Sequence, residues 1–492
     1  MKSDFANRRK CLWGYLCVLA LTFAIAVPSA ALFTGCQHQG YDESVKLQFS
    51  ADTLLFDTVF TTVSSITRSF TVHNPSSDPV SLDVYLAGGD QSYYSINVDG
   101  MAGTEFHDVE IPARDSIFVF VKVTINPLNQ NNPYLVTDSV MFCNKQRRQS
   151  VPLVAFGQDA HFVVAGSAGY ALVAGAHEQA RWTNDKPWVI YGLAAVDSLG
   201  TLTIDPGTKI YGHHGSRLWI YAGGNLQVNG THDNPVVFAG DRLESYYQTD
   251  YAQWDGIYIC EGYRDNVIDY AVIKNAAIGL QLTILNEAAH NKVKVNNTVI
   301  QNCSNIGVLA RGIDLEMTNC QISNTGSYSM LLQVGDFTLN HVTIANYYAQ
   351  SVRNDPAFLL TNYYSDNNYS WVGNTSLTCN NSIIYGNLSK NDENESDEVK
   401  VYTDDAATLS YSFNNCLIKK AESDSHFRQC IFNHDPKFIS IYGQDYNIES
   451  ASPAIDAGKT GLGINIDLLG RARNGIPDIG AYEYYPAESK RR

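Results

Sequence analysis

The sequence has 492 residues, of which 17% are charged and 45% hydrophobic, and a formal net charge of −16. Because an average globular chain is roughly 25% charged, this composition excludes a long coiled coil and a highly charged disordered protein. The 30 tyrosines favour β-structure, since aromatic side chains pack well on pleated surfaces. At roughly 100–200 residues per domain, the length predicts about two to four domains or one long repeat array.

The first 35 residues have the features of an export signal. Lys2 and residues 8–10 form a basic start, and a mostly apolar run follows from residue 12 to residue 33. The run ends in Leu32-Phe33-Thr34-Gly35-Cys36, which resembles a bacterial lipoprotein signal. The resemblance implies cleavage after residue 35, acylation of Cys36 (palmitate) and a tether over residues 36–44. It also implies anchoring to the outer membrane, facing either the cell surface or the periplasm. The alternative is a membrane-spanning helix, since about 20 apolar residues cross a bilayer.

Processing changes the charge and the cysteine content. Residues 1–35 carry a net charge of +3, so the mature chain carries −19. This charge repels phosphate backbones, and nucleic acid is therefore not an expected partner. Beyond Cys36 the seven remaining cysteines include no C-x-x-C pair, which indicates buried thiols rather than a zinc site or a full disulfide framework. We expect no metal centre and no cofactor, with calcium left open only at the C-terminal end.

Residues 45–160 are predicted to form an immunoglobulin-like β-sandwich. Short alternating runs such as residues 69–72, 80–84 and 117–121 are separated by turn-forming residues. About seven short strands in about 110 residues fit such a sandwich. The stretch at residues 69–75 resembles the opening of immunoglobulin-like modules in bacterial surface proteins. We expect a spacer here, with a binding module as the alternative.

Residues 200–450 contain a repeat with a period near 22. Ile300, Ile322 and Ile344 lie 22 residues apart, and the same frame extends to Ile273, Ile384 and Ile418. Other columns repeat in register with them. These columns are the apolar sets Val293, Leu315, Phe337 and Val295, Met317, Leu339, together with the polar sets Asn297, Asn319, His341 and Asn302, Asn324, Asn346.

This period predicts a right-handed single-stranded parallel β-helix. Each coil buries its apolar side chains against the next coil, about 4.8 Å away. The asparagine columns are expected to be structural, because stacked asparagine side chains hydrogen-bond along the stack. Residues 161–199 are expected to connect the sandwich to the solenoid and cap its start. Insertions after residue 344 are expected to lie on one face, which repeat proteins often use for binding.

Two segments resemble right-handed β-helix proteins among the surface lipoproteins of Bacteroidetes. The first is Leu202 to Thr208, followed by Gln253 to Ile257, and the second runs from Ser452 to Tyr484. The resemblance implies architecture and a C-terminal cap over residues 451–486, followed by a tail over 487–492, but no catalytic assignment. We expect four polar residues, which are Asp456, Asp467, Arg471 and Asp478, to close the open end of the solenoid.

The solenoid also contains candidate functional residues. Tyr246, Tyr247, Tyr251 and Trp254 lie in one aromatic loop and are predicted to form a platform for sugar rings, although a packing role is favoured for Trp254. A polysaccharide lyase would instead need a base and a cation. The candidate residues for that activity are Tyr258, Arg264, Lys274 and Arg311.

The favoured function is a lipid-anchored envelope protein that binds a polysaccharide or surface glycan without cleaving it. A β-helix polysaccharide lyase or glycoside hydrolase is the alternative, and an adhesive protein with a protein partner is the third possibility. Five Asp-Ser/Thr-aliphatic triplets also resemble the O-glycosylation signal of exported Bacteroidetes proteins. Their hydroxyl residues are Thr53, Thr58, Ser116, Ser139 and Ser198.

Overall fold

The computed structural model describes residues 40–61, 64–126, 134–262, 264–284, 292–365, 370–389, 396–421 and 424–486. The expected signal over residues 1–35, Cys36 and the expected tail over 487–492 lie outside these residues. The chain divides into two compact units, with the main boundary between Gly157 and Gln158. The described residues contain strands and two 3₁₀ helices but no α-helix. None of their helices is long and apolar enough to cross a bilayer.

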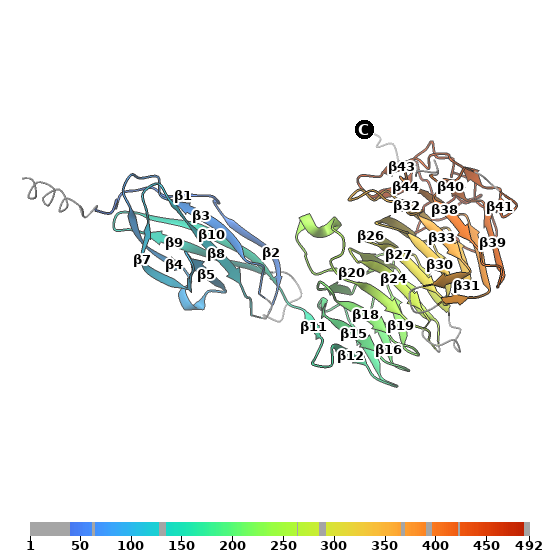
Figure 1. Ribbon diagram of the computed structural model, residues 1–492, viewed down its shortest axis with the longest axis horizontal. Coiled ribbons are helices and arrows are strands. Elements are labelled where there is room, and N and C mark those ends of the chain that lie inside the picture. The colour runs from blue at the N-terminus through green and yellow to red at the C-terminus, as the bar shows by residue number, and fades with distance from the viewer. Residues whose placement is uncertain are drawn as a thin grey trace, which may run out of the picture. The chain divides into compact units, whose positions relative to one another are not determined.

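The first unit contains two five-stranded sheets (Figure 1). Its strands pair antiparallel, as in β3 with β8 and β4 with β9. One sheet has the order β1 (Gln48–Phe49), β3 (Arg68–His73), β8 (Ser116–Val123), β5 (Tyr94–Val98) and β6 (Met101–Gly103). The other has the order β2 (Leu54–Phe60), β10 (Arg148–Gln158), β9 (Tyr134–Cys143), β4 (Val80–Leu86) and β7 (Glu105–Ile111), and η1 spans Gly89–Gln91.

Alternation along these strands builds the core of the first unit. In β8 the buried residues Ile117, Val119, Val121 and Val123 alternate with exposed neighbours. They share one hydrophobic cluster with residues of the other sheet, such as Phe142. The two sheets therefore enclose a common core, as in a β-sandwich.

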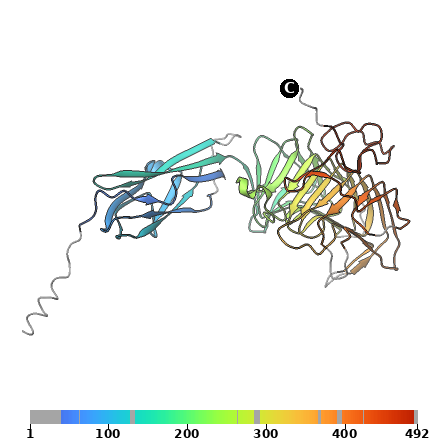
Figure 2. The same cartoon turned by 90° about the horizontal axis from the view of Figure 1, so that it is seen from above.

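The second unit is a solenoid of three long parallel sheets, which we name in the order in which the chain enters them (Figure 2). The first sheet contains β11 (His161–Val164), β14 (Trp188–Tyr191), β17 (Lys209–Gly212), β20 (Val236–Gly240), β23 (Ala271–Lys274), β26 (Val299–Cys303), β29 (Gln321–Thr325), β32 (Thr343–Asn346), β37 (Ile383–Gly386), β40 (Leu417–Ile418) and β42 (Ile431–Phe432). The second contains β12 (Tyr170–Ala174), β15 (Leu193–Val196), β18 (Arg217–Ile220), β21 (Gly256–Ile259), β24 (Ile278–Thr283), β27 (Ile306–Arg311), β30 (Met330–Gln333), β33 (Phe358–Thr361) and β38 (Val399–Tyr402).

The third sheet completes each coil. It contains β13 (Gln179–Trp182), β16 (Thr201–Ile204), β19 (Asn225–Asn229), β22 (Asn266–Asp269), β25 (Lys292–Asn296), β28 (Asp314–Thr318), β31 (Gly335–Asn340), β36 (Thr375–Asn380), β39 (Leu409–Asn414) and β41 (Phe427–Arg428). Two hairpins and a 3₁₀ helix lie outside the sheets, namely β34 (Tyr363–Ser365) with β35 (Ser370–Val372), β43 (Phe438–Ser440) with β44 (Asp445–Ile448), and η2 (Ser245–Thr249).

The strand register predicted from the repeat is confirmed. Ile273 pairs with Ile300, and the same column continues through Ile322 and Ile344 in successive parallel pairings. Beyond Ile344 it reaches Ile384 and then Ile418 despite the inserted loops. The solenoid is therefore a parallel β-helix, and the chain is all-β in its described part.

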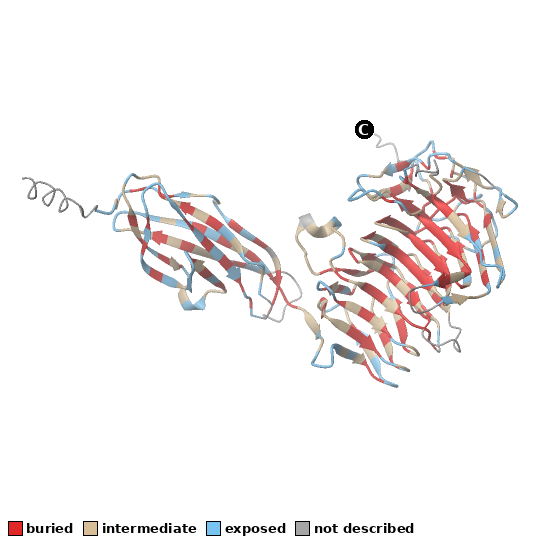
Figure 3. Cartoon of the chain, in the orientation of Figure 1, coloured by how far each residue is buried: buried red, intermediate tan, exposed pale blue. Residues whose placement is uncertain are grey.

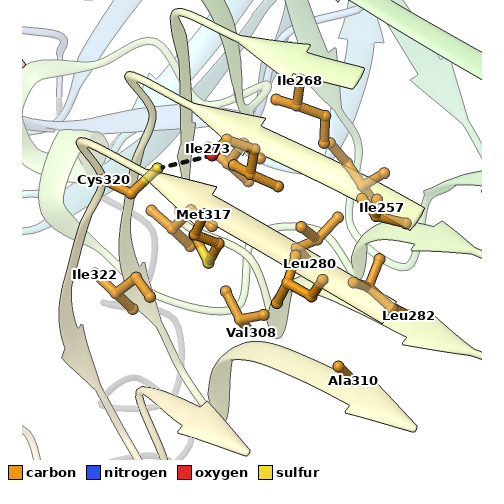
Figure 4. Close-up of a cluster of buried hydrophobic side chains, with 14 of the residues drawn as sticks. Ile257, Ile268, Ile273, Leu280, Leu282, Val308, Ala310, Met317, Cys320 and Ile322 are labelled. Carbon is orange, nitrogen blue, oxygen red and sulfur yellow. Dashed lines mark hydrogen bonds between the residues drawn. The ribbon is translucent and has the colours of Figure 1, made fainter. Parts of the chain in front are cut away.

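The interior of the solenoid is one continuous hydrophobic cluster. Figure 4 shows side chains of several coils, among them Ile273, Leu280, Val308 and Met317, pointing into the same interior space. Figure 3 shows buried residues dominating the stacked strands. The interior cysteine Cys320 behaves as a small apolar residue that donates its thiol to the Val295 carbonyl (3.4 Å).

The asparagine columns lie at the bends of each coil, with Asn297 and Asn319 between strands and Asn302 and Asn324 near the ends of β26 and β29. Asn297, Asn302, Asn319 and Asn324 all have φ between 48° and 57°, a left-handed conformation that asparagine tolerates better than most residues. Their amides also bond along the stack, since Asn319 Nδ2 lies 3.3 Å from Asn297 Oδ1 and Asn324 Nδ2 lies 3.4 Å from Asn302 Oδ1. The columns are therefore structural.

The solenoid begins earlier than expected. Residues 161–199, which we expected to connect and cap, already form the stacked strands β11 to β15, and β11 pairs in parallel with β14. The residues of this region with positive φ are His177, Leu199, Gly169 and Gly192. The asparagine signal is absent here, which is why the repeat was not recognised.

The C-terminal segment, residues 433–486, lies along the first sheet. Its polar contacts join successive coils, pairing Gln444 with Asn302, Tyr446 with Asn324, Arg473 with Asn319, Tyr482 with Gln321, and Lys459 with Asn381. A separate hydrophobic cluster lies between this segment and the sheet. The prediction that the segment caps the open end is corrected accordingly, because it covers a side of the solenoid.

Candidate functional site

The four residues considered for catalysis do not form one site. Tyr258 lies in β21 and Arg311 at the end of β27, both in the second sheet. Lys274 ends β23 in the first sheet, and Arg264 is exposed in the segment that precedes β22. Tyr258 and Arg311 share the second sheet but lie two coils and two register positions apart, and Lys274 and Arg264 lie outside that sheet, so the four residues do not converge on one site.

Lys274 lies in a pocket of about 200 Å³ beside the aromatic loop. Its ammonium donates to Gln248 Oε1 (3.0 Å), and burial lowers its pKa. Burial also raises the pKa of Tyr211, a neighbour in the same pocket, to about 12. The pocket is small for a ligand site, which usually measures about 300–1,000 Å³.

The predicted aromatic platform is only partly available. Trp254 is 1% exposed, belongs to the solenoid core and donates its indole N–H to the Lys274 carbonyl (2.9 Å), so it cannot stack on a sugar. Tyr251 packs edge-on against Tyr348, with 4.9 Å between ring centroids. Tyr247 lies under the Arg242 guanidinium, 3.8 Å from the ring centroid. The Tyr246 side chain lies outside the described part of the structure.

A second group of aromatic residues lies on the outer face of the second sheet. In β18 the side chains of Leu218 and Ile220 enter the core, so the intervening Trp219 points outward. Tyr258 pairs with Trp219 in the next coil, and their rings stack with centroids 6.0 Å apart and planes 7° apart. Tyr221, which is 40% exposed, meets Trp219 edge-on at 5.2 Å. We call Trp219, Tyr221 and Tyr258 the aromatic strip.

Charged side chains flank the aromatic strip. Arg217 lies 5.7 Å from the centre of the Tyr258 ring and bonds to Asp255 Oδ2 at 3.2 Å. Both charged side chains are more than a third exposed, so they remain accessible to a ligand. A guanidinium and a carboxylate beside stacked rings offer the hydrogen-bond donors and acceptors that orient a polar ligand.

The surroundings of the aromatic strip keep the Tyr258 phenol protonated. Burial raises the pKa of the Tyr258 hydroxyl to about 12. A general base works best with a pKa near the operating pH, so this phenol holds its proton at neutral pH. This protonation state excludes a base role for Tyr258 at neutral pH and leaves the predicted role of a phenolic acid untested.

The sequence contains a pattern that indicates the aromatic strip. In Arg217-Leu218-Trp219-Ile220-Tyr221 the apolar residues alternate with aromatic ones, and residues 256–259 continue the pattern. Alternation in a strand assigns successive side chains to opposite faces, so a tryptophan out of step with the core residues points to solvent.

Farther along the second sheet the outward positions become apolar. Tyr258 pairs with Gln281, which pairs with Leu309, which in turn pairs with Leu331. Leu309 and Leu331 are covered and form a small separate cluster with Ile306 and Leu359. Arg311 lies at the edge of this region, where its Nε donates to Gln333 Oε1 (2.7 Å). In this part of the face the aromatic strip is therefore more open than the positions of Leu309 and Leu331.

The acidic residues of the C-terminal segment serve as hydrogen-bond acceptors. The Asp467 carboxylate accepts from the backbone N–H groups of Leu469, Arg471 and Glu483, and Asp478 accepts from that of Asp456. In the described residues no group of three or more His, Cys, Asp or Glu is arranged to hold a metal ion.

The hydroxyls of the glycosylation triplets differ in exposure. Thr53 and Ser116 are exposed, whereas Thr58, Ser139 and Ser198 are partly buried. The Ser198 hydroxyl also donates to the Ala222 carbonyl. Thr53 and Ser116 are therefore the most accessible of the five.

The stacked parallel sheets define the second unit as a parallel β-helix that carries the aromatic strip on its outer face. Residues 175–276 match the family described as "Pectate-lyase like beta helix domain". The match includes β18 and β21, and with them the whole aromatic strip. No curated protein matches the chain.

Several solved structures show weak similarity. The E. coli chaperone DraB is 13% identical, with 23% of this chain and 55% of that chain covered, at a TM-score of 0.17. A Porphyromonas gingivalis W83 protein of unknown function is 14% identical, with 28% and 58% covered, at 0.18. A family 123 glycoside hydrolase from Clostridium perfringens is 8% identical, with 28% and 30% covered, at 0.18. The chain spans less than two thirds of each, and likenesses this weak carry no functional argument.

Proposed function

We propose that the protein is a cell-envelope lipoprotein that binds glycan along its β-helix without cleaving it. The observation that carries this proposal is the near-parallel stack of Trp219 and Tyr258 on the outer face of the second sheet. Aromatic side chains present large apolar faces with polar tips and are over-represented at binding surfaces. The apolar face of a sugar ring is complementary to such a surface.

The solenoid supplies the geometry that an extended ligand needs. Trp219 and Tyr258 come from adjacent coils, and the strands of adjacent coils lie about 4.8 Å apart. A rigid stack of coils holds the rings in place before the ligand arrives, so little conformational entropy is lost on binding. Arg217 and Asp255 flank the rings and are positioned to bond sugar hydroxyls.

The envelope part of the proposal rests on the sequence. Acylation of Cys36 would anchor the chain to the outer membrane, and an immunoglobulin-like first unit would act as a spacer. Glycosylation at Thr53, Thr58, Ser116, Ser139 or Ser198 would add to the surface character of the protein. The proposed function assigns no role to calcium.

The runner-up function is a β-helix polysaccharide lyase or glycoside hydrolase. The observation in its favour is the similarity of residues 175–276 to a pectate-lyase-like domain. Against it stands the separation of the four candidate residues, since Lys274 and Arg264 lie outside the second sheet and Tyr258 and Arg311 are two coils apart within it. An adhesive protein with a protein partner is the third candidate.

A glycan panel tests the proposal directly. A lipid-free chain of residues 37–492 is applied to immobilised polysaccharides, and retention is compared with that of a Tyr221→Ala/Tyr258→Ala variant. We expect the variant to lose about tenfold or more in affinity, since stacking on an aromatic ring contributes about 1 kcal/mol or more. Phe118→Ala is the matched control, because it removes an exposed ring from the first unit.

Two results would overturn the proposal. Equal retention of the double variant and the control on every retaining polysaccharide would remove the aromatic strip as the site. Unsaturated uronate absorbance or new reducing ends during incubation would show cleavage, and would favour the enzymatic alternative.

A further inference from the structure

A second pocket lies between the first sheet and the β43–β44 hairpin, away from the aromatic strip. It measures about 520 Å³, within the usual range for small-ligand sites. Its walls include four aromatic rings and two carboxylates, supplied by Tyr347, Tyr385, Phe438, Tyr442, Asp435 and Glu449. We call this the hairpin pocket.

Two rings of the hairpin pocket, those of Tyr347 and Phe438, pack against other aromatic side chains. Tyr347 stacks on Tyr446 with centroids 6.1 Å apart and planes 14° apart, and Phe438 meets it edge-on at 6.2 Å. Tyr446 in turn donates its hydroxyl to Asn324 Oδ1 (2.7 Å) in the solenoid. Through Tyr446 the rings of Tyr347 and Phe438 are therefore connected to the β-helix.

The front of the pocket is open and unusually apolar. Tyr442 is 96% exposed in the turn of the hairpin, and Ile439 beside it is 51% exposed. The hydroxyls of Tyr347, Tyr385 and Tyr442 make no hydrogen bond within the described part of the chain. Tyr347 and Tyr385 are partly buried against a hydrophobic cluster, whereas Tyr442 is open to solvent and therefore accessible to a ligand.

The charges of the pocket do not cancel. Lys437 is its single cationic lining residue among those described, and its Nζ lies 3.0 Å from Asp435 Oδ2. The Glu449 carboxylate has no ion pair with any described residue, so the lining keeps one negative charge. The net charge of −16 on the whole chain adds a long-range attraction for cations.

We infer that the hairpin pocket binds a ligand that carries an ammonium group on an apolar body. The ammonium would sit beside Glu449 and over the tyrosine rings, because the faces of aromatic rings attract cations. The apolar body would cover Tyr442 and Ile439. An anionic ligand is disfavoured, because the only lysine of the lining is already paired with Asp435. This site is independent of the glycan-binding proposal.

A series of three probes with one shared body tests the inference. 4-Phenylbutylamine, 4-phenylbutanol and 4-phenylbutyrate are titrated into the processed chain at neutral pH and low salt, with binding measured by calorimetry or ligand-observed NMR. We expect the amine to bind about tenfold more tightly than the alcohol. This difference in affinity corresponds to the combined free energy of one cation–π contact and one exposed ion pair. The carboxylate should bind more weakly than both.

Three variants assign the binding to this pocket. Glu449→Gln and Tyr442→Ala should each weaken amine binding about threefold to tenfold, and both side chains are exposed, so the fold is retained. Asp405→Asn removes the same charge from an exposed position outside the pocket and should leave binding unchanged.

Equal affinities for the amine and the alcohol would overturn the inference, as would equal effects of Glu449→Gln and Asp405→Asn. Preferential binding of neutral sugars over the amine, lost in Tyr442→Ala, would show a saccharide pocket instead. The Tyr221→Ala/Tyr258→Ala variant should bind the amine normally, so failure of glycan binding at the aromatic strip is distinguishable from failure here.

Discussion

At the scale of single residues, His341 shows how one side chain depends on a single protonation state. It occupies a turn column that holds asparagine in other coils, with φ of 55°. Its Nδ1–H donates to the Gly480 carbonyl (3.1 Å), and its Nε2 accepts from Asn381 Nδ2 (3.0 Å). Protonation would place two donors face to face, so the folded protein requires the neutral imidazole.

Acid should therefore destabilise the solenoid through His341. Burial, followed by the charge of Arg473, lowers the pKa of His341 from 6.5 to about 3. Between these values the unfolded chain binds a proton that the folded chain does not bind, so stability falls as the pH falls below about 6.5. From pH 7 to pH 5 this group should cost about 2 kcal/mol.

His341→Asn should remove this contribution while keeping a residue that tolerates the left-handed turn. The measurement is urea unfolding at pH 7 and at pH 5, with tryptophan fluorescence as the signal that reports unfolding. All tryptophans beyond Trp13 lie in the second unit, so the signal reports on the solenoid. The same loss of stability on acidification in the variant and the parent would show that His341 is not the responsible group.

At the scale of elements, the turns between sheets determine how the coils stack. Each strand of the solenoid is short, and the asparagine turns bring the chain from one sheet to the next. Asn302 is fully buried with φ of 57°. Its amide bonds both to Asn324 in the next coil and to Gln444 in the C-terminal segment. Asn302 therefore adopts the backbone conformation of the bend and also bonds both to the next coil and to the C-terminal segment.

Two substitutions at Asn302 should separate backbone strain from hydrogen bonding. Asn302→Ala should destabilise the solenoid by about 2–4 kcal/mol, because it combines an unfavourable positive φ with lost buried hydrogen bonds. Asn302→Gly loses the same bonds but relieves the strain, and should be less destabilising by about 1 kcal/mol. Urea unfolding measures both. If glycine proved the worse of the two, backbone strain would not be the reason for asparagine at this turn.

At the scale of the whole molecule, the proposed lipid anchor determines where the glycan-binding face operates. Anchoring is proposed to rest on acyl chains at Cys36, because residues 32–36 resemble a bacterial lipoprotein signal. Stable anchoring requires about two such chains or an equivalent second signal.

Cys36→Ala should therefore release the protein from the membrane. In the native host, or in a host that processes lipoproteins, we expect the parent in the detergent phase and the variant in the aqueous phase. Intact-mass analysis of the parent checks the same proposal, because processing should remove residues 1–35 and add lipid. A variant that stays membrane-bound would indicate an uncleaved helix, and a mass equal to lipid plus polypeptide alone would argue against O-glycosylation.

The sequence by itself determined the core of the solenoid. Ile300, Ile322 and Ile344 repeat because every coil buries an equivalent residue against its neighbour, and the asparagines repeat because each turn needs a left-handed residue. Both requirements are local and recur at a nearly constant spacing, so they are visible in a single chain. Where other residues adopt the left-handed conformation, as at His177 and Leu199, the backbone requirement is the same but no residue type repeats in the sequence.

The tertiary structure alone decided which side chains share a surface. Trp219 and Tyr258 are neighbours only because a loop of variable length still closes the coil in register. The C-terminal segment lies along the solenoid through pairs such as Tyr482 with Gln321 and Arg473 with Asn319, more than 150 residues apart. Such contacts depend on the shapes of two distant surfaces, and no periodicity in the sequence encodes them.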